Sequence, residues 1–305
     1  MGRILPILIA AALITASCGG SDGDVTTDVA PVDDSTTSTS TGAPTTGSTT
    51  PTTLPPTDST SVVISRLYAI GGWTGSEWEP YEGLPPADIP ARDGDTFRVS
   101  VVDGGDGATT VGGDPEETCE PLGVYGIPTS PELFYEFGEP APIAVKAAWD
   151  ISPRPVLVLD PIPSEYQGII SEFLEGRGID DPVVEIIQAV KTDLQGDGVD
   201  EVVLVAEHHN GFFNEQFGDY SLVLLRTVVD EVVQTAVLGE SLVLDATDPG
   251  LFVRYRLSTL ADLNGDAKLE VVTTSTYYEG AGTSVWEYIN DELGPTVVMS
   301  AACGA

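Results

Sequence analysis

A pattern of strand, acidic loop, strand and hairpin occurs twice in the C-terminal half of the chain, with loops that begin at residues 193 and 262. Within each copy, short apolar stretches are bounded by Gly, Asp and Asn, which is typical of β-strands. The expected strands are 183–190, 201–206, 221–229 and 232–238 in the first copy, and 251–260, 270–274, 283–289 and 295–300 in the second. A repeated unit buries its apolar face by stacking on its neighbours. The repeat therefore predicts a mainly β protein of four-stranded antiparallel units, propeller-blade-like and with a ring that could be incomplete.

The rest of the folded region is expected to be a β-rich N-terminal region, 62–182, followed by the two repeats over 183–305. Short extended pieces are expected at 62–70, 96–102, 143–149 and 156–159, between clusters of Gly, Pro and Asp. One short helix is expected near residues 164–176. Ser164 and Gln167 suit a capping box at its start, and Gly residues suit its end.

Both repeats contain a nine-residue loop with oxygen-bearing side chains at positions 1, 3, 5 and 9. Position 7 can offer its main-chain carbonyl, so a turning loop collects five hard oxygens around one centre. Such a donor set suits Ca²⁺ and not Zn²⁺ or Cu²⁺. The loops are not EF-hands, because position 12 is Leu204 in one copy and Thr273 in the other. An acidic turn without metal is the alternative.

The pattern Asp-x-Asn-Gly-Asp-Gly-x-x-Glu followed by Val-Val resembles the calcium loop of FG-GAP/VCBS-type repeats, known from integrin-like β-propellers and secreted bacterial proteins. The resemblance covers residues 183–301. It implies a Ca²⁺ cofactor held at the matching positions of the two loops. These positions are Asp193, Gln195, Asp197, Val199 and Glu201, and then Asp262, Asn264, Asp266, Lys268 and Glu270.

Two residues depart from this family pattern. Gln195 is longer than the usual Asp or Asn, and Ala267 replaces a Gly that is expected at positive φ, a cost of about 1 kcal/mol. Because only the first loop keeps Gly at position 6, we expect Ca²⁺ to act chiefly through that loop.

A shift of 69 residues, the spacing of the two loops, also places His208 and His209 on Tyr277 and Tyr278. These four residues could form a shared ligand-binding rim. The alternative is that the ends of strands repeat because the fold does. Adjacent histidines point to opposite faces of a strand, which disfavours joint chelation of a metal.

Aromatic residues in the N-terminal region offer a second candidate surface. Trp73, Trp78 and Tyr81 could stack on a sugar or a base. A Trp in a Gly/Pro-rich loop more often covers a neighbouring core.

The first eighteen residues are typical of a lipoprotein signal peptide. Arg3 supplies a positive charge, an apolar run follows, and small residues precede Cys18 as in a lipobox, although Thr15 departs from the usual aliphatic residue. We expect lipidation at Cys18; a secretory signal with an incidental Cys is the alternative. Residues 19–61 are expected to be a disordered Thr/Ser/Pro tether, since they have almost nothing to bury.

With Cys18 assigned to the lipid, Cys119 and Cys303 remain. In an oxidising compartment a disulfide between them is the simplest interpretation, and two buried free thiols are the alternative.

The charge of the chain restricts its partners. Its 48 acidic and 12 basic residues give a formal net charge of -36, which disfavours nucleic acid. No nucleophile elbow, HExxH or phosphate-binding Gly-Lys-Ser/Thr motif is present, so an enzyme is less expected than a non-enzyme. The sequence favours an extracytoplasmic, membrane-anchored lipoprotein at the cell surface or in the envelope. Its expected function is that of a calcium-binding module that binds an envelope protein or glycan or has a structural role. Its alternatives are a hydrolase that uses the acidic loops or the His208 rim, and a ligand-capturing lipoprotein.

Overall fold

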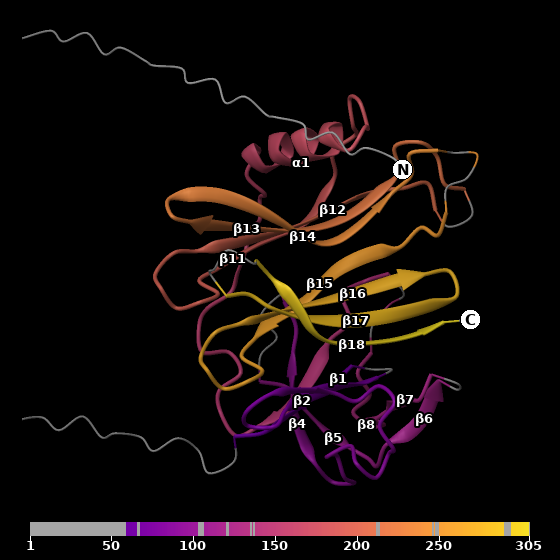
Figure 1. Cartoon of the computed structure of the whole chain (residues 1–305), viewed down its shortest axis with the longest axis vertical. Helices are drawn as coiled ribbons and strands as arrows, with labels where there is room; N and C mark the ends of the chain where they lie inside the picture. The colour runs from indigo at the N-terminus through magenta and orange to yellow at the C-terminus, as the bar shows by residue number, and fades with distance from the viewer. Residues whose placement is uncertain are drawn as a thin grey trace, which may run out of the picture. The chain divides into compact units, whose positions relative to one another are not determined.

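Four antiparallel β-sheets and one short helix make up the described part of the chain (Figure 1). The computed structural model describes residues 59–304 apart from 66–67, 103–106, 120–121, 135, 137, 212–213, 246, 248–249 and 290–293, all within the compact unit Thr53–Ala305. The predicted mainly β class is confirmed. Cys18, the signal peptide and most of the tether lie outside the described residues. Within these residues, no helix has the length and apolar character to cross a membrane.

The two sequence repeats form two separate sheets. The five-stranded sheet has the order β10 (Leu157–Val158), β11 (Ile186–Thr192), β12 (Glu201–His208), β13 (Tyr220–Val229) and β14 (Val232–Leu242). The four-stranded sheet has the order β15 (Arg254–Ala261), β16 (Glu270–Tyr277), β17 (Gly280–Glu287) and β18 (Thr296–Gly304). Each predicted set of four strands is therefore one up-and-down meander, and the first gains β10 at its edge.

The N-terminal region forms a seven-stranded sheet and a small hairpin. The sheet has the order β3 (Trp78–Pro80), β2 (Ala69–Trp73), β1 (Ser61–Ser65), β9 (Ile143–Ala147), β4 (Thr96–Ser100), β5 (Thr109–Gly112) and β8 (Thr129–Ser130). The hairpin consists of β6 (Glu116–Cys119) and β7 (Val124–Gly126). The extended piece predicted at 62–70 is two strands, β1 and the start of β2, because the chain turns between them.

Within the seven-stranded sheet, β9, β1, β2 and β3 form a third meander like those of the repeats. Ser61 at the start of β1 pairs with the last residue of β9, just as Glu201 and Glu270 pair with the last residues of β11 and β15. The first strand of this meander comes from later in the chain than the other three. Three sheets thus share one local plan, although one of them is assembled from distant segments.

The four-stranded sheet lies between the other two large sheets (Figure 1). Successive residues of β16 point to opposite faces: Val272 packs with the seven-stranded sheet and Val271 with the five-stranded sheet. Helix α1 (Glu165–Gly176) covers the far side of the five-stranded sheet with Ile170 and Leu174. Both faces of the middle sheet are therefore buried, which fixes the loops at its ends.

The short helix occurs where it was predicted, but its expected capping box does not form. Ser164 has helical backbone angles and makes no side-chain capping bond. The amides of Gly178 and Ile179 bond back to the carbonyls of Glu175 and Leu174, with Gly178 at φ 99°, so the glycine end is confirmed.

A disulfide joins Cys119 in β6 to Cys303 in β18, with Cα atoms 5.9 Å apart. The pairing predicted from the cysteine count is confirmed. It links residues 184 positions apart and ties the last strand of the chain to the hairpin of the N-terminal region.

Candidate metal centre

Both acidic loops fold around the carboxylate at position 1. Asp193 Oδ1 accepts a bond from the Gly196 amide at 2.6 Å, and its Oδ2 accepts one from Gly198 at 2.9 Å. Asp262 accepts the equivalent bonds from Gly265 at 2.6 Å and Ala267 at 2.9 Å. The two loops, separated by 69 residues and lying on different sheets, therefore have the same turn.

The glutamate at position 9 connects each loop to the strand that follows. Glu201 Oε2 accepts a bond from the Leu194 amide at 2.8 Å, and Glu270 Oε2 accepts one from Leu263 at 2.7 Å. Both glutamates are only 2% exposed. A buried carboxylate is costly unless hydrogen bonds or a cation compensate it, so these two groups are the ones whose charge most needs a partner.

Positions 3 and 5 differ between the loops. Asn264 Oδ1 accepts a bond from the Asp266 amide at 2.9 Å, which holds its oxygen close to the turn. Gln195, at the same position of the first loop, instead donates its Nε2 to the Tyr288 carbonyl at 3.3 Å. At position 5, Asp197 and Asp266 both accept from the amide two residues further on. The longer Gln195 side chain thus packs between sheets, whereas Asn264 stays in the loop.

Position 6 has positive φ in both loops, as expected from the sequence. Gly198 has φ 88° and Ala267 has φ 65°. The alanine side chain makes this conformation cost about 1 kcal/mol, yet the amide of Ala267 still reaches Asp262. The predicted strain is therefore present, and it does not prevent the turn.

Burial and like charges raise the pKa of several of these carboxyl groups. Burial is the main cause for Glu201, with the nearby Asp197 and Asp193 adding to it, and the pKa rises to about 7. Burial likewise raises the pKa of Glu270 well above its ordinary value, and that of Asp262 less. In the more open Asp193, amide bonds outweigh burial and lower the pKa. A divalent cation would offset this accumulated negative charge.

The donor types fit Ca²⁺, although the side chains do not converge as a ready-made cage. Across the described ranges, no three His, Cys, Asp or Glu side chains are grouped closely enough to hold a metal ion by themselves. Ca²⁺ also takes oxygens from amide side chains, main-chain carbonyls and water. Gln195 or Asn264 and the carbonyls of Val199 or Lys268 could provide such oxygens.

A connector after β9 contacts both loops, which the sequence did not indicate. Trp149 Nε1 donates to the Asp262 carbonyl at 3.0 Å. Arg154 donates from Nε to the Asp193 carbonyl at 2.6 Å and from Nη2 to the Leu194 carbonyl at 2.9 Å. The loops also touch directly, because the Leu269 amide donates to the Leu194 carbonyl at 2.8 Å. The loops and connector form one hydrogen-bonded unit.

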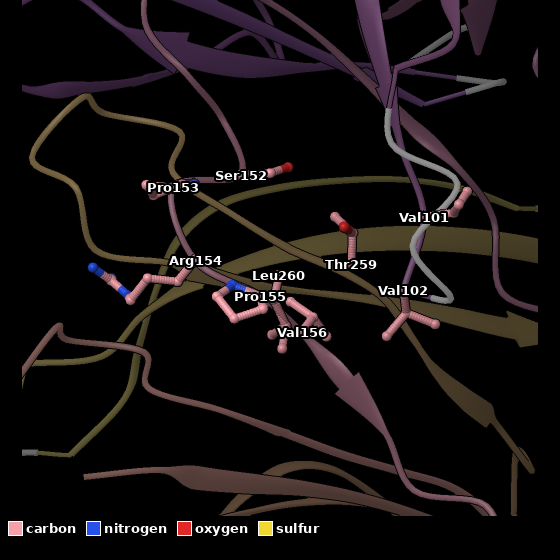
Figure 2. Close-up of a pocket in the computed structure, with 9 residues that line it drawn as sticks. All are labelled: Val101, Val102, Ser152, Pro153, Arg154, Pro155, Val156, Thr259 and Leu260. Carbon is pink, nitrogen blue, oxygen red and sulfur yellow. The ribbon is translucent and has the colours of Figure 1, made fainter. Parts of the chain in front are cut away.

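The same connector lines a cavity of about 360 Å³ beside β15 (Figure 2). Figure 2 shows Arg154 extending away from Val102 and Thr259, toward the loop whose carbonyls it holds. The nine lining residues are Val, Pro, Leu, Ser, Thr and Arg, with no carboxylate or imidazole among them. Among the residues that the structure describes, this cavity therefore lacks the acid and base that a hydrolase would need.

The four residues of the predicted rim lie at the ends of β12 and β16, but they have separate neighbours. His208 Nδ1 lies 3.1 Å from Glu185, and His209 Nε2 lies 3.4 Å from Glu207. The ring of Tyr277 instead lies over Gly280 and Gly304, and Tyr278 is about half exposed. The structure thus places His209 beside a buried ion cluster, in which Glu207 accepts bonds from Arg254 and Arg256 and so joins the two repeat sheets.

The three aromatic residues near β3 differ in burial: Tyr81 is buried, whereas Trp73 and Trp78 are half-buried. Trp73 and Trp78 meet edge to face with centroids 5.2 Å apart. Tyr81 is 2% exposed and belongs to the core of the N-terminal region, so it is not free to stack on a ligand.

Comparison with models of known families, with curated proteins and with solved structures gives no match. The resemblance to FG-GAP/VCBS repeats therefore rests on the loop residues themselves.

Proposed function

We propose that this chain is a calcium-stabilised binding or structural module tethered to the outer face of a cell membrane. The observation that carries the proposal is the agreement between the two loops. At positions 1, 5 and 9, each loop has a carboxylate that accepts the same main-chain bonds. A cation site common to both loops would require carboxylates at matching positions.

Calcium would serve this protein by neutralising carboxylates at the starts of β12 and β16. Glu201 and Glu270 are buried at these two positions, with further loop carboxylates nearby. A bound Ca²⁺ supplies positive charge and no redox chemistry. The carboxylate side chains would hold each loop in its turn. The first loop then sets the spacing between the two repeat sheets, because its Leu194 carbonyl accepts a bond from the Leu269 amide of the second loop.

We further propose that the three meanders are propeller-like blades. The order of strands and the pairing at the start of the second strand agree among all three. Helix α1 covers the outer face at one end of the stack, and a separate apolar cluster packs on the seven-stranded sheet at the other. Because both end sheets would then have their outer apolar faces buried, a partial stack of blades would not need to close into a ring.

The envelope location rests on the sequence and on redox chemistry. Disulfides persist mainly in oxidising compartments, and the Cys119–Cys303 bond is consistent with export. In cells that express the protein, Cys18→Ala should release it from the membrane fraction or leave it unprocessed. Membrane fractionation and lipid labelling that Cys18→Ala leaves unchanged would refute the anchor.

The calcium part of the proposal is tested by direct binding. Protein stripped with a chelator should bind Ca²⁺ in a calorimetric titration up to about millimolar free ion, the range of extracellular modules. Mg²⁺, which demands stricter octahedral geometry, should compete poorly. Absence of Ca²⁺ binding over this range would refute the proposed function.

A further inference from the structure

One buried hydroxyl group of the four-stranded sheet has no hydrogen-bond partner. Thr276 lies on β16 and is 3% exposed, and within the described part of the chain its Oγ1 is the one buried side-chain oxygen or nitrogen that makes no hydrogen bond. Successive side chains of a strand alternate between its faces, so Thr276 shares the face of Val272, which packs with the seven-stranded sheet. Leaving a buried hydroxyl unpaired costs folding free energy, so a partner for Thr276 is expected at this interface.

Thr276 lines a cavity of about 10 Å³ between the four-stranded sheet and the N-terminal region. The Tyr68 hydroxyl, also at this cavity, donates to the Ala281 carbonyl of β17 at 2.6 Å. Further lining residues with hydroxyl groups are Ser65, Thr274 and Thr283. The nine described lining residues include no carboxylate or imidazole, which disfavours a divalent cation. A cavity of this volume has room for one water molecule, and it offers the polar partners that a buried water needs.

The equivalent position of the first repeat has a residue with charged partners. Thr276 is six residues after the start of β16, and Glu207 is six residues after the start of β12. Glu207 accepts bonds from Arg254 at 2.8 Å and from Arg256 at 2.7 Å, both on the first strand of the neighbouring sheet. The first interface, between the five-stranded and four-stranded sheets, is thus closed here by direct ion pairs.

At the second interface, between the four-stranded and seven-stranded sheets, the corresponding positions are apolar. Ile143 pairs with the fifth residue of β1, as Arg256 pairs with the fifth residue of β16. Ile143 is therefore the counterpart of Arg256, and Ala141, two residues earlier, is the counterpart of Arg254. Ala141 is buried and lines the cavity. Its methyl group neither fills the volume of an arginine nor donates a hydrogen bond, which accounts for both the cavity and the unpaired hydroxyl.

We infer that one internal water molecule binds Thr276 at the second interface, where it takes the place that the Arg254 guanidinium has at the first. A threonine hydroxyl and a water can each donate and accept, so either can be the donor. The other polar groups of the cavity complete the hydrogen bonds of the water. The water thereby links the last repeat to the N-terminal region. The inference does not depend on calcium binding.

The direct test is a high-resolution crystal structure of the protein. We expect a water molecule at hydrogen-bond distance from Thr276 Oγ1, enclosed between the two sheets. Thr276→Ser keeps the hydroxyl and should keep the water, whereas Thr276→Val should lose the bond to it. Absence of density beside Oγ1 in the wild-type crystal, or a metal ion in that place, overturns the inference.

Denaturant unfolding of Thr276→Val gives a second readout, because the two states of the hydroxyl predict opposite signs. If Oγ1 binds a water, valine removes a hydrogen bond from a buried polar group and the unfolding midpoint should fall. If Oγ1 is unpaired, the methyl group removes the cost of burying it and the midpoint should rise. Thr296→Val is the matched control, because Thr296 is exposed on β18 and its change should leave the midpoint in place. A midpoint for Thr276→Val that equals or exceeds that of wild type contradicts the bound water.

Discussion

Glu201 and Glu270 belong to the packed fold and, in the function proposed above, to the calcium sites as well. Each starts a strand, is buried, and bonds through one oxygen to the amide of loop position 2. Without metal, burial favours the protonated form, which is why the pKa of Glu201 rises to about 7. The same residues would be charged when Ca²⁺ is bound, because calcium takes carboxylate ligands.

The raised pKa of Glu201 makes the stability of metal-free protein depend on pH. Its pKa is about 7 when folded and near 4.5 when unfolded, so the folded state binds the proton more tightly. The resulting stabilisation is complete below about pH 4.5 and is lost as the pH rises through 7. In chelator, urea unfolding at pH 5 and pH 8 should show a smaller loss of stability for Glu201→Gln than for wild type. Equal losses would contradict the raised pKa.

At the scale of elements, the connector after β9 joins loops that belong to different sheets. Trp149 bonds to the second loop and Arg154 to the first. A Cβ on Gly265 would lie 3.1 Å from the Trp149 ring, so the second loop needs a glycine where it packs on the connector. The loops therefore depend on the N-terminal region for their shape.

Removing the Arg154 side chain should weaken this connection. Arg154→Ala removes the side-chain donor of the Asp193 and Leu194 carbonyls, although Leu194 keeps its bond from the Leu269 amide, and we expect a loss of about 1–3 kcal/mol of unfolding free energy in chelator. Arg226→Ala is the control, since Arg226 makes an exposed bond to Thr235 and its loss should cost less than about 1 kcal/mol. If denaturant unfolding gives the two variants equal stability, the connector has no such role.

The sequence predicts well those strands that pair with their neighbours along the chain. The two sets of strands follow from alternating apolar residues around one acidic loop, and their pairings match the expected hairpins. The third meander was missed because its first strand, β9, follows the other three in the chain. The predicted capping box failed because Ser164 has helical backbone angles, which leave its side chain without the capping geometry.

The candidate site also combines features that are local in the sequence with contacts between distant segments. The turn that the two loops share was predictable from the spacing of Asp, Gly and Glu, whereas the contact of Gln195 with Tyr288 was not. Trp149 and Arg154 come from another part of the chain, and only the packing of the sheets places them beside the loops. These contacts could therefore not be derived from the loop sequences alone.

For the whole molecule, the disulfide is the longest-range covalent constraint. Cys119→Ser combined with Cys303→Ser opens a closure of 184 residues, and chain entropy assigns about 5 kcal/mol to a loop of that size. We expect the double variant to unfold at lower denaturant concentration, by an amount corresponding to about 2–5 kcal/mol. Reduction of wild type should give a similar shift. An unchanged midpoint would show that the bond does not hold β18 in place.

The most direct test of a calcium-stabilised fold is thermal unfolding with and without chelator. A ligand that binds only the folded state adds RT ln(1 + [L]/Kd), about 2.7 kcal/mol at a hundredfold excess over Kd. For a folded region of this size that free energy corresponds to a rise of about 5–10 °C in Tm. We expect wild type to show this rise with Ca²⁺, and Asp197→Ala and Asp266→Ala each to lose part of it. A wild-type Tm that is the same in Ca²⁺ and in chelator would contradict calcium stabilisation.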